Sequence, residues 1–524
     1  MKRTTYKIVL KQTGSLFLTL GIVVIVPALV AAIYREWYSA MGFLLSGLMI
    51  SCTGLALYRG FYQAEELRYY HALVVAAFGW LAITLAGGLP FFLIAWITPV
   101  DVMNRLIPSG SSYDTSSLLY FRNFLHCFFE SMSAYTTTGL SMAVHEPSVG
   151  KGVLFYRSLA QWTGGAGFIV LVLAILKQSS GRGAMLLYGS ETTGERLTPK
   201  VIETARGIWK VYVLVTAFSA VYLFAGTWLI LPDYPLTENL FDSVNHAMCG
   251  QSTGGFSTLD DSIATYHSPA MDMLYLLPMI LGSFSLPFFY KLIYKRKYNE
   301  WWRDIQTRAL LITFVAGGII QSLLLFRANV VPEPFREGVF QFVSAMSTTG
   351  WQTSNIGNWD WLSVVFIVGT AMYVGGAAGG TVGGIKMIRA LLIKKVLRWQ
   401  VNKVFLSRYT VKSMKFNGKV MLPEEMNEEF TKASALAIIF FLLVIGSSVA
   451  GALYTEGSFT FADALFESGS AQGTVGLSSG ITDPGMPWGL ELIYIFQMWS
   501  GRLEIIPVFA LIRGLIWGTN PGKI

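Results

Sequence analysis

The feature that most constrains this chain is a series of apolar segments long enough to cross a lipid bilayer. A spanning helix needs about 20 predominantly apolar residues. Ten segments meet this requirement: residues 14–34, 40–58, 72–97, 152–176, 208–231, 270–290, 309–326, 361–396, 433–454 and 489–517. Only 13% of the 524 residues are charged, against about 25% in soluble domains. We therefore predict an all-α, multi-pass protein of the cell membrane.

Basic residues orient these segments. Lys and Arg cluster before the first segment and in the gaps that follow the fourth, sixth and eighth segments. By the positive-inside rule, these gaps and both termini are cytoplasmic. The net charge of +8 is mostly this bias, so it does not indicate a nucleic-acid partner. A basic surface that faces membrane lipid or another protein is the better interpretation.

The opposite, outward side is acidic. Its carboxylates are Asp101, Asp114, Glu130, Glu146, Asp233, Glu238, Asp242, Asp260, Asp261, Glu333, Glu337, Asp360, Glu456, Asp463, Glu467 and Asp483. Two interpretations stay open at this stage. The distribution is either the complement of the positive-inside rule or an outer vestibule that concentrates cations.

Each outward gap among the last eight segments contains a hydroxyl-rich turn that is too apolar for a surface loop and too short to span. The turn "SAYTTTGLS" (133–141) is centred on Gly139, and the third and fourth turns are centred on Gly350 and Gly476. In the second turn, the choice between Gly254 and Gly255 stays open. Spacing favours Gly255, because Asn123 and Asn239 stand sixteen residues before Gly139 and Gly255. Three turns share a Phe ten residues and an Ala five residues before the glycine: Phe129, Phe340 and Phe466, and Ala134, Ala345 and Ala471.

This recurrence predicts four helix–pore-loop–helix repeats in a pseudo-fourfold arrangement around one pore. Two extra transmembrane helices precede them, which gives ten spanning helices and four re-entrant loops. The predicted units are residues 1–68 for the two N-terminal helices and 69–190, 191–298, 299–420 and 421–524 for the four pore repeats. The third repeat also carries an intramembrane glycine loop.

The composition of the turns indicates a cation site. A short helix of about 11 residues rises ~17 Å, about half the hydrocarbon thickness, and its returning backbone must line water or be buried. Free carbonyls on that backbone can replace the hydration shell of a cation, and glycine permits the required backbone angles. The candidate ion-binding residues are Thr137, Thr138, Gly139, Thr253, Gly254, Gly255, Thr348, Thr349, Gly350, Thr474, Val475 and Gly476.

Four further stretches carry a family resemblance. They are "FYRSLAQWTGGAGFIVLVLAIL" (155–176), "LTPKVIETARGIWKVYV" (197–213), "GGIKMIR" (383–389) and "GRLEIIPV" (501–508). The chain resembles the Trk/Ktr/HKT superfamily of potassium transporters over essentially its whole length. It is most similar to the TrkH branch, because the two leading helices are absent from the shorter Ktr members.

This resemblance implies a pseudo-tetrameric pore that binds K+ at the filter residues, a homodimer, and a cytosolic regulatory subunit of the TrkA type. Nucleotide is expected on that subunit, and no cofactor is expected on this chain. In the superfamily, a Ser at the first filter glycine is associated with sodium passage. Gly139 therefore favours potassium.

The eighth segment is oversized and contains "GGAAGGTVGGIK", residues 375–386. It lacks the spacing of a nucleotide-binding P-loop, and glycine at this density destabilises a regular helix. The stretch is either a loosely packed helix junction or a flexible gate below the filter, and the resemblance favours the gate. The candidate gate residues are Gly375, Gly376, Gly379, Gly380, Gly383, Gly384, Lys386 and Arg502.

Arg502 lies near the middle of the last apolar segment. A charge at that depth costs ~2.5 kcal/mol or more and normally faces the protein interior or a wet cavity. Glu504 is two residues away and points to another face of a helix. Arg502 therefore either pairs with an unidentified acid or borders the pore and opposes cations near the glycine loop.

The function that these features predict is potassium uptake through a gated selectivity filter. The alternative is a secondary transporter of another cation, such as sodium, or of a small solute bound by broken helices at the midplane. Passive conduction and coupling to sodium or protons both stay open. The chain shows no paired carboxylates, activated nucleophile or metal-ligand spacing, and its three cysteines form no disulfide framework. We therefore do not expect an enzyme.

Overall fold

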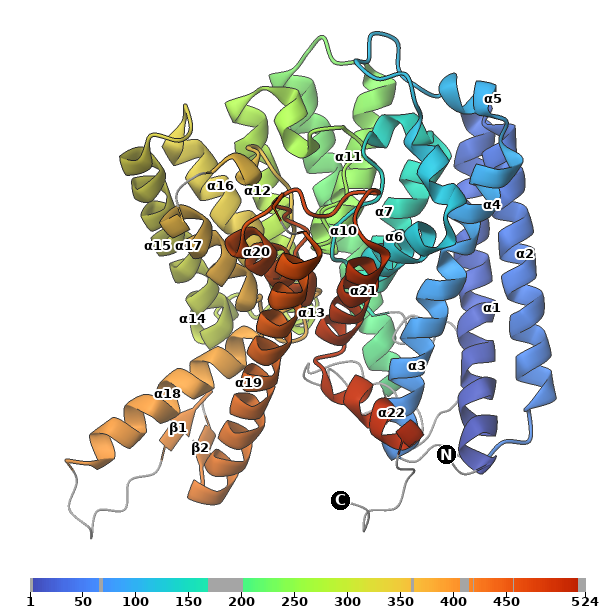
Figure 1. Ribbon diagram of the computed structural model, residues 1–524. Coiled ribbons are helices and arrows are strands. Elements are labelled where there is room, and N and C mark those ends of the chain that lie inside the picture. Colours follow the sequence, from blue (N-terminus) through green and yellow to red (C-terminus); the bar gives the residue numbers. More distant parts are fainter. Residues whose placement is uncertain are drawn as a thin grey trace.

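The computed structural model describes residues 3–65, 69–167, 201–359, 362–405, 414–417, 419–455 and 457–516. It is mostly helical, and it has one short hairpin of strands β1 (Met414–Phe416) and β2 (Lys419–Met421). We call "inner" the side on which α1 begins and α22 ends, and "outer" the opposite side (bottom and top of Figure 1).

Two long helices, α1 (Arg3–Ile33) and α2 (Trp37–Gly60), form a hairpin at one edge of the protein (Figure 1). Glycines bring them close together. A Cβ atom added to Gly21 of α1 would lie 2.0 Å from Ser51 Oγ and 2.8 Å from the Gly47 carbonyl oxygen of α2. Small residues allow such close approach between membrane helices.

After this hairpin, the order of a long helix, a short helix and a further helix recurs four times. The first set is α3 (Tyr69–Gly87) with α4 (Leu89–Ile97), then α6 (Phe124–Thr136) and α7 (Lys151–Gly165). The second is α10 (Val201–Ile230), α11 (Leu236–Gln251), and α12 (Pro269–Ser283) with α13 (Leu286–Ile293). The third is α15 (Ile305–Ala328), α16 (Pro334–Met346), and α17 (Leu362–Tyr373) with α18 (Met387–Lys403). The fourth is α19 (Pro423–Tyr454), α20 (Phe461–Gly473), and α21 (Trp488–Arg502) with α22 (Ile506–Ile516).

Short elements complete the connections between these helices. They are α5 (Val100–Asn104), α14 (Glu300–Arg303), η1 (Ser117–Arg122), η2 (Glu146–Val149), η3 (Ser262–Tyr266) and η4 (Ile356–Asn358).

Fewer uninterrupted spans are described than the ten that we predicted. Six helices are long and apolar enough to cross a membrane: Thr5–Ile33, Trp37–Gly60, His71–Ile97, Glu203–Ile230, Ile305–Ala328 and Glu424–Tyr454. Two bent pairs, α12 with α13 and α21 with α22, raise the number to eight. The predicted span 152–176 continues past residue 167, outside the described residues. The span 361–396 is divided into α17 and α18.

Two predictions of continuous helix are wrong, because segments 270–290 and 489–517 bend by 95° and 115°. In a continuous helix the N–H of residue 287 would donate to the Ser283 carbonyl, but residue 287 is a proline and has no N–H. That carbonyl accepts instead from Ala377 N–H, at 2.9 Å. The second break lies at Glu504 and Ile505, whose φ angles are 55° and 70°.

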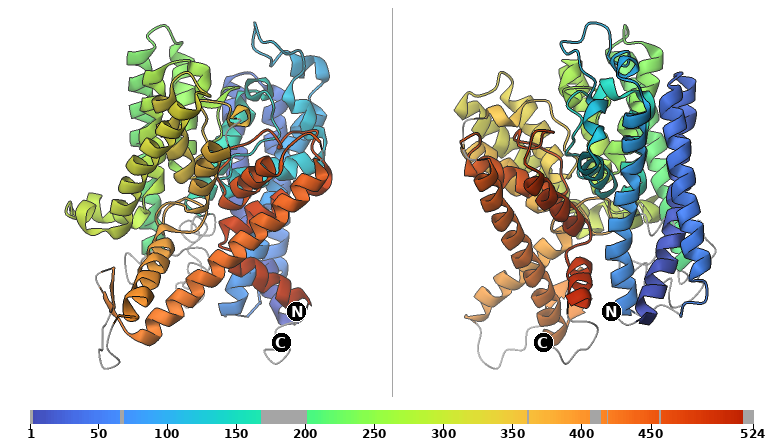
Figure 2. Two further views of the ribbon diagram at one scale, coloured as in Figure 1. Left: turned by 60° about the vertical axis from the view of Figure 1, so that its left-hand side comes forward. Right: turned by 45° about the vertical axis from the view of Figure 1, so that its right-hand side comes forward.

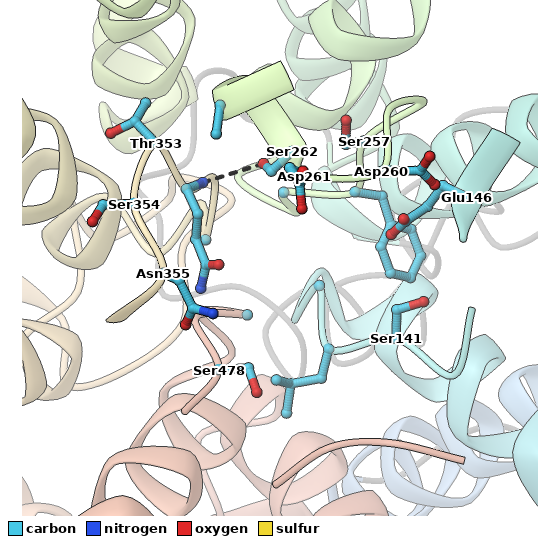
Figure 3. A pocket seen from close by; sticks show the side chains of 18 of the residues that line it. Ser141, Glu146, Ser257, Asp260, Asp261, Ser262, Thr353, Ser354, Asn355 and Ser478 are labelled. Atoms are coloured by element: carbon cyan, nitrogen blue, oxygen red, sulfur yellow. Dashed lines mark hydrogen bonds between the residues drawn. The ribbon is translucent and has the colours of Figure 1, made fainter. Parts of the chain in front are cut away.

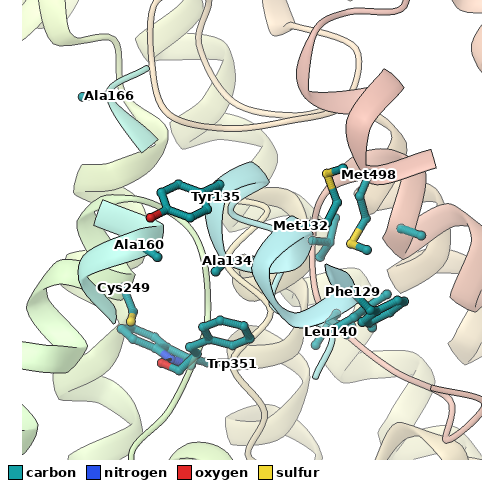
Figure 4. Packing of buried hydrophobic residues seen from close by; sticks show 14 of the residues in the cluster. Phe129, Met132, Ala134, Tyr135, Leu140, Ala160, Ala166, Cys249, Trp351 and Met498 are labelled. Atoms are coloured by element: carbon teal, nitrogen blue, oxygen red, sulfur yellow. Dashed lines mark hydrogen bonds between the residues drawn. The ribbon is translucent and has the colours of Figure 1, made fainter. Parts of the chain in front are cut away.

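The core of the protein lies around the short helices. The Phe and Ala residues that recur before three of the turns are buried at 2% exposure or less, and Figure 4 shows Phe129 and Ala134 of α6 among them. The second repeat has Gly250 in place of the alanine. A Cβ at Gly250 would lie 2.7 Å from Trp351 Cη2, so the Trp351 ring fills this space.

At the inner side, α18, the β-hairpin and α19 project away from the other helices (Figures 1 and 2). This inner extension has a small core of its own. The core consists of Leu392, Val396, Met414, Met426 and Ala433. The extension follows directly on the glycine segment, so its movement can reach that segment.

Replacement of Gly21 by Leu should lower the thermal stability of the purified protein, because the new side chain overlaps Ser51 and Gly47. Overpacking of this kind costs about 1–3 kcal/mol. Thermal unfolding in detergent measures the effect. Gly446→Leu in α19 is the matched control, because a Cβ there meets nothing within 4 Å. Equal melting temperatures for the two variants would contradict the close packing of α1 and α2.

Candidate ion-binding site

The four short helices α6, α11, α16 and α20 lead into the same backbone turn. Its first residue has a left-handed φ in every case: Thr137 57°, Thr253 53°, Thr348 55° and Thr474 50°. The glycine two residues later also has positive φ: Gly139 95°, Gly255 76°, Gly350 86° and Gly476 96°. By this geometry Gly255, rather than Gly254, is the counterpart of the other three glycines.

The hydrogen bonds of the turns repeat in the same way. The N–H that follows each threonine donates to the carbonyl five residues earlier: Thr138 to Ser133 (2.9 Å), Gly254 to Cys249 (2.8 Å), Thr349 to Ser344 (3.0 Å) and Val475 to Ser470 (2.9 Å). These bonds use carbonyls at the end of each short helix, so each turn is fixed to the helix that precedes it.

The four turns contact one another in a closed cycle, which we call the ring. A Cβ added to each glycine would meet the carbonyl oxygen of the next turn: Gly139 that of Gly254 (2.4 Å), Gly255 that of Thr349 (1.8 Å), Gly350 that of Val475 (2.1 Å) and Gly476 that of Thr138 (2.3 Å). The fourth turn thus returns to the first. The structure therefore brings all the predicted ion-binding residues together in one ring.

The electrostatics of the ring suit a cation. The C-terminal end of a helix carries a partial negative charge, and four short helices end at the ring. The ring residues contribute hydroxyls and backbone carbonyls but no formal charge. Such groups can coordinate a dehydrated monovalent cation.

A polar side chain nine residues before each glycine supports the chain that leaves the ring. Each one accepts from the N–H three residues after the glycine: Glu130 from Met142 (2.8 Å), His246 from Thr258 (3.3 Å), and Glu467 from Ser479 (2.7 Å). In the third repeat, Gln341 accepts from Thr353 (2.8 Å) when its amide oxygen faces the donor. The sequence analysis did not identify this position, although a polar residue at one fixed offset in four apolar segments is a visible signal.

Four carboxylates that we assigned to the acidic outer side are buried instead, and one of them, Glu337, is 3% exposed and lies beside Arg336. Glu130 and Glu467 are 0% exposed and Asp242 is 2% exposed. Their oxygens accept hydrogen bonds from neighbouring hydroxyls and N–H groups, for example Ser141, Thr258 and Thr482. They hold the backbone behind the ring, so they are not exposed charges of an outer vestibule.

Other carboxylates do line a cavity of about 750 Å³ on the outer side of the ring (Figure 3). The four ring glycines form part of its wall. Its charged residues are Glu146, Asp260, Asp261, Asp272 and Arg336, of which Asp272 and Arg336 are an ion pair at 3.3 Å. Burial raises the pKa of Glu146 to about 8, and the guanidinium of Arg157, 3.8 Å away, opposes this shift.

The glycine segment, residues 374–386, lies against the other side of the ring. Thr381 Oγ1 is 3.2 Å from Thr253 Oγ1, and Gly383 N–H donates to Thr348 Oγ1 at 3.2 Å. A Cβ at Gly383 would lie 1.9 Å from Thr474 Oγ1. The segment therefore contacts three of the four threonines that begin the turns with a left-handed φ angle.

The same segment is not the loosely packed junction that we considered. Gly375 N–H donates to Ile385 O at 3.0 Å, and Leu286 N–H donates to Gly379 O at 3.0 Å. A Cβ at Gly376 would lie 2.5 Å from the Ser283 carbonyl oxygen. The remaining candidate gate glycines, Gly380 and Gly384, lie in the same folded stretch, and Lys386 donates to the Val382 carbonyl.

Arg502 ends α21 at the break, not in the middle of a helix. Its guanidinium donates to the Thr381 carbonyl, to the carbonyls of Gly164 and Gly165 at 2.6 Å each, and to Thr137 Oγ1 at 3.1 Å. It thus reaches the fourth left-handed threonine. These contacts place Arg502 beside the ring and the glycine segment.

An ion pair links the glycine segment to the last helix break. Arg389, near the start of α18, donates to Glu504 at 2.5 Å. Glu504 is one of the two residues with positive φ between α21 and α22. A displacement of α18 would therefore act on the break beside Arg502.

Comparisons with known proteins identify the family of this chain. A profile of the TrkH family of cation transport proteins matches residues 71–516. An uncharacterized cation transporter of Methanocaldococcus jannaschii is 30% identical over 511 residues, which cover 98% of this chain and 96% of that protein. The Trk system potassium uptake protein TrkH of Halomonas elongata is 28% identical, over 98% of this chain and 99% of that protein.

The fold is shared with a solved structure. The crystal structure of the potassium transporter TrkH from Vibrio parahaemolyticus matches with a TM-score of 0.78 at 22% identity, over 99% of this chain and 100% of that chain. The family profile and the relatives confirm the resemblance to the TrkH branch. With the profile and the relatives that span nearly its whole length, the chain belongs to the TrkH family of cation transport proteins.

Proposed function

We propose that this chain takes up potassium across the cell membrane and that the ring is its selectivity filter. The observation that carries the proposal is the closed cycle of four glycine–carbonyl contacts. Backbone oxygens from four sides can replace the hydration shell of K+, and four helix C-termini favour its positive charge. Relatives of this chain are named as potassium uptake proteins, which supports potassium as the transported ion.

The alternative is a transporter of sodium or of a small solute held by broken helices. Broken helices are present, but the backbone groups freed at the α12–α13 break form hydrogen bonds within the protein. The Ala377 N–H donates to the Ser283 carbonyl, and the Leu286 N–H donates to the Gly379 carbonyl. An organic solute would need different polar groups on different sides. The ring has four uncharged walls built from the same backbone turn, and this repetition favours a small spherical cation.

We further propose that the glycine segment, together with Arg502, closes the pore on the inner side of the ring. Arg502 places a positive charge beside Thr137 and holds the Thr381 carbonyl. Opening then requires residues 374–386 to move away from Thr253, Thr348 and Thr474, and Arg502 to leave Thr137. The ion pair of Arg389 with Glu504 and the inner extension provide a route for that movement.

A cytosolic, nucleotide-binding subunit of the TrkA type is the partner that we propose for this regulation, with the chain assembled as a homodimer. The inner extension supports this partner because it is basic and projects from the protein. Its basic residues include Lys394, Lys395, Arg398, Lys403 and Lys415. Lipid headgroups would be attracted to the same charges. A second basic cytoplasmic loop, residues 177–206, is also expected to contact this partner, and it lies mostly outside the described residues.

Replacement of Gly139 by Ser should reduce the preference for potassium over sodium, because the side chain would enter the contact with Gly254 at a φ of 95°. A loss of ~1–2 kcal/mol in discrimination lowers the flux ratio by about 5- to 30-fold. Uptake into proteoliposomes measures the ratio. The equivalent changes at Gly350 and Gly476 should also impair transport.

The control for these variants is Gly110→Ser. Gly110 has a similar φ of 89°, but a Cβ there meets nothing within 4 Å. If the three ring variants are well folded and keep the ion ratio of the parent, the ring is not the filter.

Deletion of three or four residues within 375–384 should raise ion flux and leave selectivity largely intact, because the ring residues are untouched. Arg502→Ala should act in the same direction, since it removes both a tether of the segment and a positive charge. A barrier lowered by ~1 kcal/mol raises the rate about fivefold. Arg513→Ala, in α22 beyond the break, is the control. Should both variants fold and conduct no faster than the parent, gating lies in another element.

A further inference from the structure

The four turns differ at one position, the residue between the threonine and the glycine. It is Thr138, Gly254, Thr349 and Val475 in the four repeats. Only the second repeat has no side chain there. The reason is the side chain of Gln161 from α7, because a Cβ added to Gly254 would lie 2.4 Å from both Cδ and Oε1 of Gln161. A side chain from the first repeat thus occupies the space that the second turn leaves empty.

Both polar atoms of the Gln161 side-chain amide form hydrogen bonds with the second turn. Its Nε2 donates to the Gly254 carbonyl at 2.5 Å, and its Oε1 accepts from Phe256 N–H at 3.1 Å. The two bonds lie on either side of Gly255, the ring glycine of this repeat. Gln161 is 0% exposed, so these bonds are formed away from solvent and fix the turn strongly.

The first of these bonds makes the ring asymmetric. The Gly254 oxygen is also the one that meets Gly139 in the cycle of contacts. An oxygen that already accepts from an amide donates less electron density to a cation. Within the described residues, no hydrogen bond reaches the corresponding oxygens of Thr138, Thr349 and Val475. One wall of the ring is therefore held more tightly and is a weaker ligand than the other three.

We propose that Gln161 is a positioning residue that sets the second wall of the filter and thereby tunes the discrimination between potassium and other monovalent cations. This inference rests on the proposed function of the ring. Gln161 acts through the Gly254 carbonyl and the Phe256 N–H, not by contact with the ion.

The first test is Gln161→Met, which keeps the length of the side chain and removes both hydrogen bonds. The expected result is a change of about fivefold in the K+/Na+ flux ratio of proteoliposomes, the equivalent of one hydrogen bond. A role in packing alone would change the yield or the melting temperature but not this ratio. Gln497→Met is the matched control. Gln497 is equally buried in α21, but it donates to the Ser468 carbonyl of α20 at 3.3 Å, outside the ring.

The second test exchanges the two side chains. Gly254→Thr alone should abolish selective uptake, because the new Cβ overlaps Gln161. Adding Gln161→Ala opens the space and gives the second turn the same Thr-Thr-Gly sequence as the first and third. It should restore K+ uptake, but with a K+/Na+ flux ratio that differs from that of the parent, because both Gln161 hydrogen bonds are absent. This double variant decides the question if Gln161→Met fails to fold.

The outcomes separate this inference from the proposed function. If the parent does not discriminate between K+ and Na+, the proposed function of the ring fails. If the parent is selective and Gln161→Met keeps its ratio, the ring stands as a filter but Gln161 does not position it. A double variant no more active than Gly254→Thr alone would also overturn the inference.

Discussion

Backbone that leaves the helical conformation inside a membrane must find new hydrogen-bond partners, and the rest of this structure depends on how the chain meets that requirement. The ring is held from behind by a buried polar side chain in each repeat and by Gln161 in the second. On the inner side, the Arg502 guanidinium satisfies carbonyls of α7 and of the glycine segment. Polar groups are therefore buried where irregular backbone needs them.

The two sides of the ring are built differently, and this difference matches their proposed roles. The outer side combines rigid support with a wide cavity lined by carboxylates, which suits the entry of cations. The inner side is covered by residues 374–386, which are held by hydrogen bonds to neighbouring helices, for example to Ser283 and Gln306, and by Arg502. A filter has to keep its geometry, whereas a gate has to lose contacts at a small cost in free energy.

The fourfold repeat and the residues that form the ring could be predicted from the sequence alone, because hydroxyl and glycine residues recur at fixed offsets. It did not reveal the sharp breaks in α12–α13 and α21–α22, although Pro287 and Pro507 were visible and remove one helical N–H each. The sequence placed Arg502 near the glycine loop, but the individual pairings of Gln161 with Gly254 and of Arg502 with Thr381 could not be predicted. They join residues about 90 and 120 positions apart, and only the tertiary fold brings them together.

The central claim is that the ring selects potassium by backbone coordination. The most direct measurement is the uptake of K+, Rb+, Na+ and Li+ by proteoliposomes that contain the purified parent protein. Carbonyl coordination by four walls predicts that K+ and Rb+ enter at similar rates and that Na+ and Li+ enter at least about tenfold more slowly, a difference of ~1.4 kcal/mol. Equal uptake of all four ions, or faster uptake of Na+ than of K+, would contradict this account.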